Sequence, residues 1–133
     1  MTAAPLAIAG PSLAEVEAAR LTVSRVAEVT PMETSRYLSD LLGAPVHLKC
    51  ENLQRTGSYK IRGAYNRISR LSDEEKARGV VAASAGNHAQ GVAFAARELG
   101  IQATIFMPIG VALPKLQATR HYGAEVVLRG HTA

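Results

Sequence analysis

The chain has 133 residues, of which 47% are hydrophobic and 20% charged, a composition that suits one globular domain with a modest core. The net charge of +4 admits a nucleic-acid partner, but the basic residues are dispersed without interleaved aromatic residues, so we interpret them as solvated faces. No apolar run reaches the roughly 18 residues that a membrane helix needs, and we therefore expect neither a nucleic-acid nor a membrane partner.

Residues 1–11 lack the basic region and apolar core of a secretory signal, so we expect a flexible tail. A helix is predicted over residues 12–26, because Ser12 is a favoured cap and Glu15 stands at capping-box spacing. From residue 12 to residue 133 we expect one continuous module.

Thr30-Pro31 breaks the chain after this helix, and a second helix is predicted over about residues 33–42. The apolar run 46–50 predicts a strand. It ends in Cys50, which is the one cysteine and so has no intrachain partner for a disulfide. A single cysteine of this kind suits a reducing cytoplasm.

The next segment, 56–64, opens a helix that runs to about residue 71, because apolar residues follow it at helical spacing. Ser58 or Thr56 is the expected cap, which places Lys60 in the first turn.

A cation is unfavourable at the electropositive start of a helix, and Arg62 adds to the effect on Lys60. Both favour the neutral amine, which is a nucleophile that can form a Schiff base with a carbonyl. The alternative for Lys60 is a solvent-exposed first-turn lysine with no chemical role.

A short helix is predicted after Ser72, and the run 80–83 then predicts a buried strand of a parallel sheet. The loop 84–88 and a helix over 87–99 follow. A strand, a small polar loop and a helix N-terminus together form an anion site.

Within this loop, Ser84 offers a hydroxyl, Gly86 permits close approach of a ligand, and Asn87 supplies an amide donor. The alternative for Asn87 is a helix cap. His88 by itself is more typical of a helix terminus than of a base, and no other histidine supplies metal-ligand spacing, so we expect no metal site.

Two further strands, 103–107 and 125–128, alternate with a helix over about 114–122. The strand starts are 22 to 23 residues apart, which indicates repeated βα units and a small parallel sheet with right-handed crossovers. The predicted class is thus α/β: a small three-layer parallel sheet domain over about 54–133, preceded by N-terminal helices, with an open sheet edge after Leu128.

Five motifs between about Val29 and Gly130 occur in order, with the spacing of one family: Thr30-Pro31, Lys49–Gln54, Thr56–Ala64, Ser84–Gly91 and Gly123–Val127. Together they resemble the pyridoxal-phosphate enzymes of the tryptophan-synthase-β fold type (fold type II), and within it the threonine and serine dehydratases.

The resemblance implies roles for six residues. Lys60 carries the cofactor as a Schiff base and later removes the substrate α-proton, Asn87 bonds the ring 3′-oxygen, and Tyr59 lines the ring. Backbone N–H groups at Ser84, Gly86 and His88 hold the substrate carboxylate. The implied reaction converts L-threonine into 2-oxobutanoate and ammonia, a step of isoleucine biosynthesis, in a cytoplasmic enzyme that forms homo-oligomers.

Three alternatives stay open or are disfavoured. A serine dehydratase or racemase relative is one, although Ala85 stands where racemases carry a serine base. A Rossmann nucleotide binder is disfavoured, because 85–91 lacks the Gly-x-Gly-x-x-Gly pattern. The third is a non-catalytic fragment: the family's glycine-rich phosphate cradle is absent, as the 11 glycines are scattered. We therefore expect an incomplete module that is inactive alone.

Overall fold

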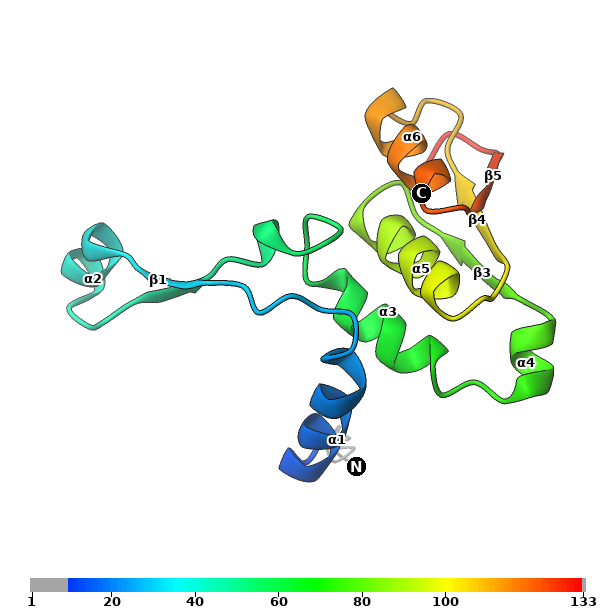
Figure 1. The fold of residues 1–133 in the computed structure, drawn as a ribbon. Helices are drawn as coiled ribbons and strands as arrows, with labels where there is room; N and C mark the ends of the chain where they lie inside the picture. The colour runs from blue at the N-terminus through cyan, green and yellow to red at the C-terminus, as the bar shows by residue number, and fades with distance from the viewer. Residues whose placement is uncertain (1–9, 133) are drawn as a thin grey trace, which may run out of the picture.

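The computed structural model describes residues 10–132, so most of the tail predicted for 1–11 lies outside the described residues. Figure 1 shows the order of the elements along the chain. They are α1 (Leu13–Val23), β1 (Met32–Thr34), α2 (Arg36–Leu42), β2 (His47–Lys49), the 3-10 turn η1 (Glu51–Leu53), α3 (Lys60–Ile68), α4 (Asp73–Ala77), β3 (Val80–Ala83), α5 (Asn87–Glu98), β4 (Ala103–Met107), α6 (Leu113–His121) and β5 (Glu125–Leu128).

The predicted parallel sheet is confirmed. Its strand order is β3-β4-β5, and Val80 pairs with Ala103 while Thr104 pairs with Glu125. Helices α5 and α6 pack on the sheet, and α3 packs on α5, so that three layers follow one another (Figure 1). Within the described residues β5 is an edge strand, in line with the open sheet edge predicted after Leu128.

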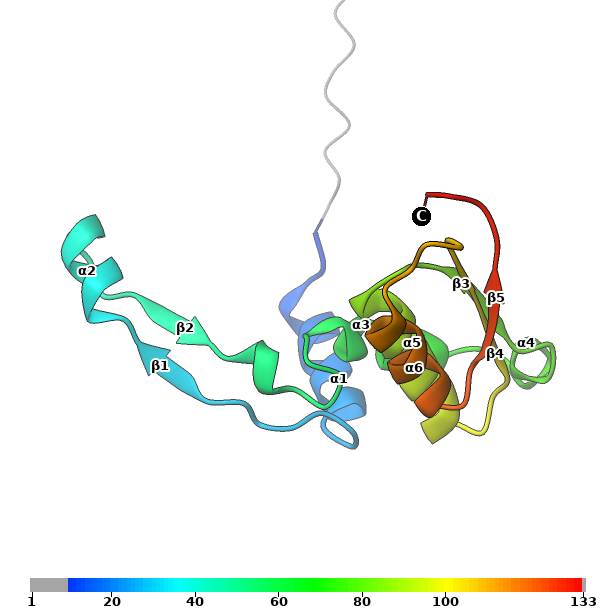
Figure 2. The ribbon, with the colours of Figure 1, turned by 90° about the horizontal axis from the view of Figure 1, so that it is seen from above.

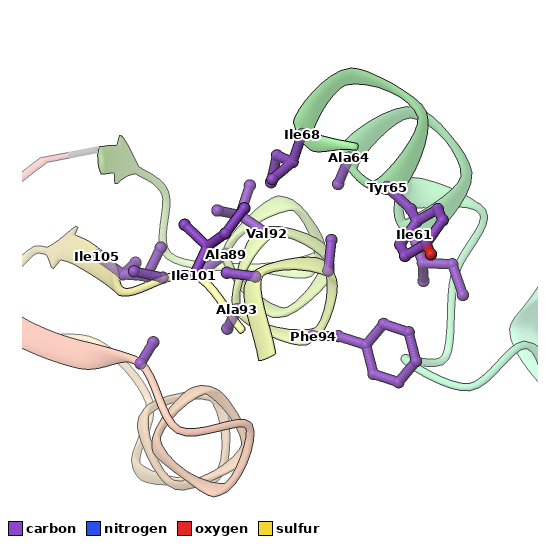
Figure 3. Close-up of a cluster of buried hydrophobic side chains, with 14 of the residues drawn as sticks. Ile61, Ala64, Tyr65, Ile68, Ala89, Val92, Ala93, Phe94, Ile101 and Ile105 are labelled. Atoms are coloured by element: carbon purple, nitrogen blue, oxygen red, sulfur yellow. The ribbon is translucent and has the colours of Figure 1, made fainter. Parts of the chain in front are cut away.

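The hydrophobic core lies mainly between α3, α5 and β4 (Figure 3). Four positions of α3 at helical spacing are buried: Ile61, Ala64, Tyr65 and Ile68. They pack against α5, whose Gly91 stands against the backbone of Lys60 and Ile61. Small residues let the two helices approach closely, and Ile61 has no exposed surface. Burial of these four side chains against α5 thus fixes the position of the helix that begins at Lys60.

The prediction of a helix over 33–42 is wrong in its first three residues. Glu33 and Thr34 belong to β1, which pairs antiparallel with β2, and the helix begins only after Ser35. Ser35 caps α2 by accepting a hydrogen bond from the Leu38 N–H, which sets the helix start. No residue of these two strands or of α2 is buried, and this unit projects from the body as an arm (Figures 1 and 2).

Strand β3 is only half buried, whereas the sequence predicted a buried strand. Its residues alternate, and Val81 is 71% exposed while Ala82 faces the helices. Alternation is the pattern of a sheet that is covered on one side only. The structure covers β3 from the α5 side, and a continuous apolar run could not reveal that. Separately, every helix within residues 10–132 is too short or too polar to span a bilayer.

Candidate active site

Lys60 lies in the first turn of α3, as predicted; it is the first residue of the helix and is half buried. The cap differs from the prediction: Tyr59 stands at the cap position without a side-chain hydrogen bond, and Ser58 Oγ accepts a long one, 3.4 Å, from the Lys60 N–H. Lys60 Nζ lies 5.0 Å from the centroid of the Tyr59 ring, which is 58% exposed. The amine therefore stays near the surface beside an aromatic face.

Arg62 does not act on Lys60 as an unpaired charge. Its Nε and Nη2 donate to the two carboxylate oxygens of Glu51 at 2.8 and 2.7 Å. Residues two apart on a helix point to roughly opposite sides, so Arg62 and Lys60 diverge. The bidentate pair balances the guanidinium charge, which removes the contribution that sequence reasoning assigned to Arg62.

Glu51 is the most strongly perturbed acid among residues 10–132. Its hydrogen bonds from Arg62, aided by one from Thr30, lower the pKa of the carboxyl from its ordinary 4.5 to about 2. Partial burial opposes this shift. The carboxylate is therefore charged at neutral and at mildly acidic pH.

We expect the Glu51–Arg62 pair to make the free energy of unfolding fall as the pH becomes acidic. A carboxyl whose pKa falls on folding stabilises the folded state above its unfolded pKa, and this contribution is lost as the pH falls from about 4.5 toward 2. With allowance for screening of the partly exposed Arg62, it is worth about 1–2 kcal/mol. In urea unfolding, Glu51→Gln should be less stable than wild type by this amount at pH 6, and the difference should vanish near pH 2. A difference that is constant with pH would contradict the assignment.

The start of α5 is capped by Ser84 rather than by Asn87. Ser84 Oγ accepts hydrogen bonds from the N–H groups of Gly86 and Ala89, each at 3.3 Å. Gly86 is the cap residue and makes no side-chain bond. The Asn87 side chain is exposed, and no hydrogen bond to it is found within residues 10–132. The alternative reading of Asn87 as a cap is therefore wrong, and its amide is available to a ligand.

The backbone N–H groups of this loop that stay free for a ligand are not the ones expected from the sequence. The Ser84 N–H donates to the Phe106 carbonyl at 3.0 Å, in line with the sheet, and the Gly86 N–H is held by Ser84 Oγ. In the described part of the chain, the N–H groups of Ala85, Asn87 and His88 have no hydrogen-bond partner. Three donors at the positive end of a 12-residue helix remain for an anion. The His88 side chain is exposed.

Gly91 brings the two halves of the site together. A Cβ atom at Gly91 would lie 3.1 Å from the Lys60 carbonyl carbon, 3.2 Å from its oxygen and 3.3 Å from the Ile61 nitrogen. Asn87 stands four residues before Gly91, so it lies one turn away on the same side of α5. The helix contact thus places the start of α5 next to the start of α3, with Asn87 near Lys60.

This set of groups fits an aldehyde cofactor held beside a second, anionic ligand. It offers one primary amine, one free carboxamide, unpaired N–H groups and an exposed aromatic ring. No group of three potential metal ligands occurs among the described residues.

Sequence reasoning missed Glu51, Thr30 and Gly91 as parts of this site. All three stand inside the quoted motifs, but nothing local in the sequence pairs Glu51 with an arginine 11 residues away. A glycine inside a helical pattern was the one available signal, because it indicates close approach of another backbone.

Comparison with known proteins finds matches that cover most of this chain. The family model described as "Pyridoxal-phosphate dependent enzyme" matches residues 23–132. The L-threonine ammonia-lyase of Thermotoga maritima is 53% identical over 120 residues, which are 90% of this chain and 30% of that protein. The L-threonine dehydratase catabolic TdcB of Staphylococcus aureus is 51% identical, over 90% of this chain and 35% of the relative. The chain thus spans about a third of the length of these curated relatives.

Solved structures agree in fold. The processed form of threonine deaminase isoform 2 from Solanum lycopersicum matches with a TM-score of 0.78 and 44% identity, over 92% of this chain and 35% of that one. Maize serine racemase matches with a TM-score of 0.82 and 34% identity, over 88% of this chain and 36% of that one.

Proposed function

Because this chain belongs to the family of pyridoxal-phosphate-dependent enzymes, we propose that it is the lysine-bearing part of an ammonia-lyase that converts L-threonine into 2-oxobutanoate and ammonia. The two curated relatives are named for threonine ammonia-lyase or dehydratase activity, and they support this substrate. The whole enzyme would be cytoplasmic and homo-oligomeric.

One observation carries the proposal: α3 and α5 pack side by side, with Gly91 in the second turn of α5 against the Lys60 carbonyl group. There the Lys60 amine, the free Asn87 amide and unpaired N–H groups come from two helix N-termini on one side of the molecule. A structural lysine would need none of these neighbours.

The residues of this chain then have distinct tasks. Lys60 would hold the cofactor covalently through Nζ and would serve as the base for the substrate α-proton. Asn87 would donate its amide to the ring oxygen, and Tyr59 would line the ring face. The cofactor, when bound, supplies the electron sink for the α-carbanion.

The substrate carboxylate would lie at the start of α5. The N–H groups of Asn87 and His88, with that of Ala85, have no partner among residues 10–132 and point to this role. Ser84 would act through its hydroxyl, which fixes the loop, rather than through its own N–H.

L-Serine, which would give pyruvate, is the second candidate substrate. The structural similarity to maize serine racemase favours it. Racemisation itself is disfavoured, because Ala85 has no group that could move a proton on the opposite face of the substrate.

The test is a map of cofactor attachment among the four lysines, Lys49, Lys60, Lys76 and Lys115. The chain is mixed with pyridoxal phosphate, reduced with borohydride and analysed by peptide mass. We expect an adduct concentrated at Lys60, and no ammonia release from threonine by the 133-residue chain alone. Labelling spread evenly over the four lysines would contradict the proposed role of Lys60.

A further inference from the structure

We propose that Glu51 is a positioning residue for Lys60, which acts through Arg62 and Thr30 to hold the first turn of α3 in place. This inference rests on the proposed function of Lys60. It assigns no contact between Glu51 and either substrate or cofactor.

The Glu51 carboxylate is the centre of a polar cluster. It accepts both guanidinium hydrogen bonds of Arg62 and, at 2.7 Å, the hydroxyl hydrogen bond of Thr30. The Glu51 side chain is 15% exposed, that of Arg62 is 37% exposed, and Thr30 is buried. A bidentate pair fixes distance and orientation together, which a single lysine–carboxylate contact cannot do.

The same cluster ties three separate segments to one another. Lys49 Nζ donates to the Thr30 carbonyl at 2.6 Å, and the Cys50 N–H donates to the Pro31 carbonyl at 3.0 Å. The polar cluster around Glu51 therefore holds three segments together: residues 30–31, the end of β2 and the start of α3. Glu51 is the residue that connects the first two segments to the helix.

The opposite side of the Lys60 turn is held by apolar packing. Ile61 is fully buried, and the Gly91 backbone abuts the Lys60 carbonyl group. Packing limits the approach of α3 to α5 but leaves sliding and rotation less restricted, because dispersion contacts are non-directional. The Glu51–Arg62 pair supplies the directional restraint. A displacement of about 1 Å at a reacting group can cost about a hundredfold in rate.

The experiment compares the 133-residue wild-type chain with Glu51→Gln, which keeps the shape of the side chain and removes its charge. Glu98→Gln is the matched control, since it breaks an exposed carboxylate pair with Arg97 near the far end of α5. Thr30→Val and Thr30→Ser form a second pair, in which only serine keeps the hydroxyl that donates to Glu51.

Two readouts are taken on each variant. The first is amide hydrogen exchange in residues 62–65. The second is the rate of the pyridoxal-phosphate adduct at Lys60, divided by the rate of its acetylation by a small neutral reagent. General loosening of the fold would change both reaction rates of Lys60 together, whereas loss of positioning would lower only the rate of adduct formation.

We expect Glu51→Gln to raise exchange in residues 62–65 and to lower the adduct-to-acetylation ratio about tenfold. Thr30→Val should follow in the same direction, and Thr30→Ser and Glu98→Gln should resemble wild type. An unchanged ratio in Glu51→Gln, with Lys60 still preferred in wild type, would overturn the positioning role and leave the proposed function intact.

A wild-type chain without preference for Lys60 would instead contradict the proposed function. Exchange in residues 62–65 would then decide the positioning role by itself: faster exchange in Glu51→Gln supports it, and unchanged exchange overturns it.

Discussion

Lys60→Ala is expected to abolish ammonia release by a chimera in which this chain replaces the matching N-terminal segment of the Thermotoga maritima L-threonine ammonia-lyase. The two segments are 53% identical over 120 residues, so the remainder of the relative supplies the part of the enzyme that this chain does not span. Loss of both the covalent anchor and the base should lower kcat by at least ~10³-fold. The measurement is the release of 2-oxobutanoate from threonine at saturating cofactor.

Lys115→Ala is the matched control for this experiment. Lys115 also stands in the first turn of a helix of the same domain, but on α6, away from the contact of α3 with α5. We expect its chimera to keep the activity of the parent chimera. Substantial activity in Lys60→Ala, with the control unaffected, would remove Lys60 from the mechanism and with it the proposed function.

Gly91→Ala and Gly91→Val are expected to destabilise the fold and displace Lys60. The new Cβ would meet main-chain atoms of Lys60 and Ile61 at 3.1–3.3 Å, and backbone can yield only if α3 moves as a unit. We expect a net loss of about 1–2 kcal/mol for alanine, and more for valine because it adds bulk at the same contact. Thermal unfolding followed by circular dichroism measures the change.

Gly63→Ala is the control, because we expect it to stabilise the protein instead of destabilising it. Gly63 is also inside a helix, but a Cβ there would meet nothing within 4 Å. Alanine should therefore stabilise α3 by about 0.5–1 kcal/mol through its better helix propensity. Equal stabilisation by Gly63→Ala and Gly91→Ala would show that the contact between α5 and Lys60 does not restrict the size of residue 91.

The arm formed by β1, α2 and β2 shows where sequence reasoning fails. The strand over 46–50 was predicted near its true place, but Glu33 and Thr34 were assigned to a helix. Their strand exists because β1 pairs with β2, and such pairing is a tertiary property of two short segments. Each strand has three residues, too few for alternation to be recognised.

Sequence alone determined the repeated βα units, the parallel sheet, the start of the lysine helix and the motifs at Lys60 and Asn87. These depend on local periodicity and on the order of short motifs, both of which are written along the chain. The same information indicated the cofactor class, which the family match bears out.

Only the tertiary structure decided how the site is held. The pairing of Arg62 with Glu51, the contact of Gly91 with the Lys60 carbonyl, and the use of Ser84 as the cap of α5 each join atoms from different elements. A side chain has several possible partners within reach of its segment, and the one it takes depends on which elements the core brings together. For this protein, burial of the apolar face of α3 against α5 makes that choice.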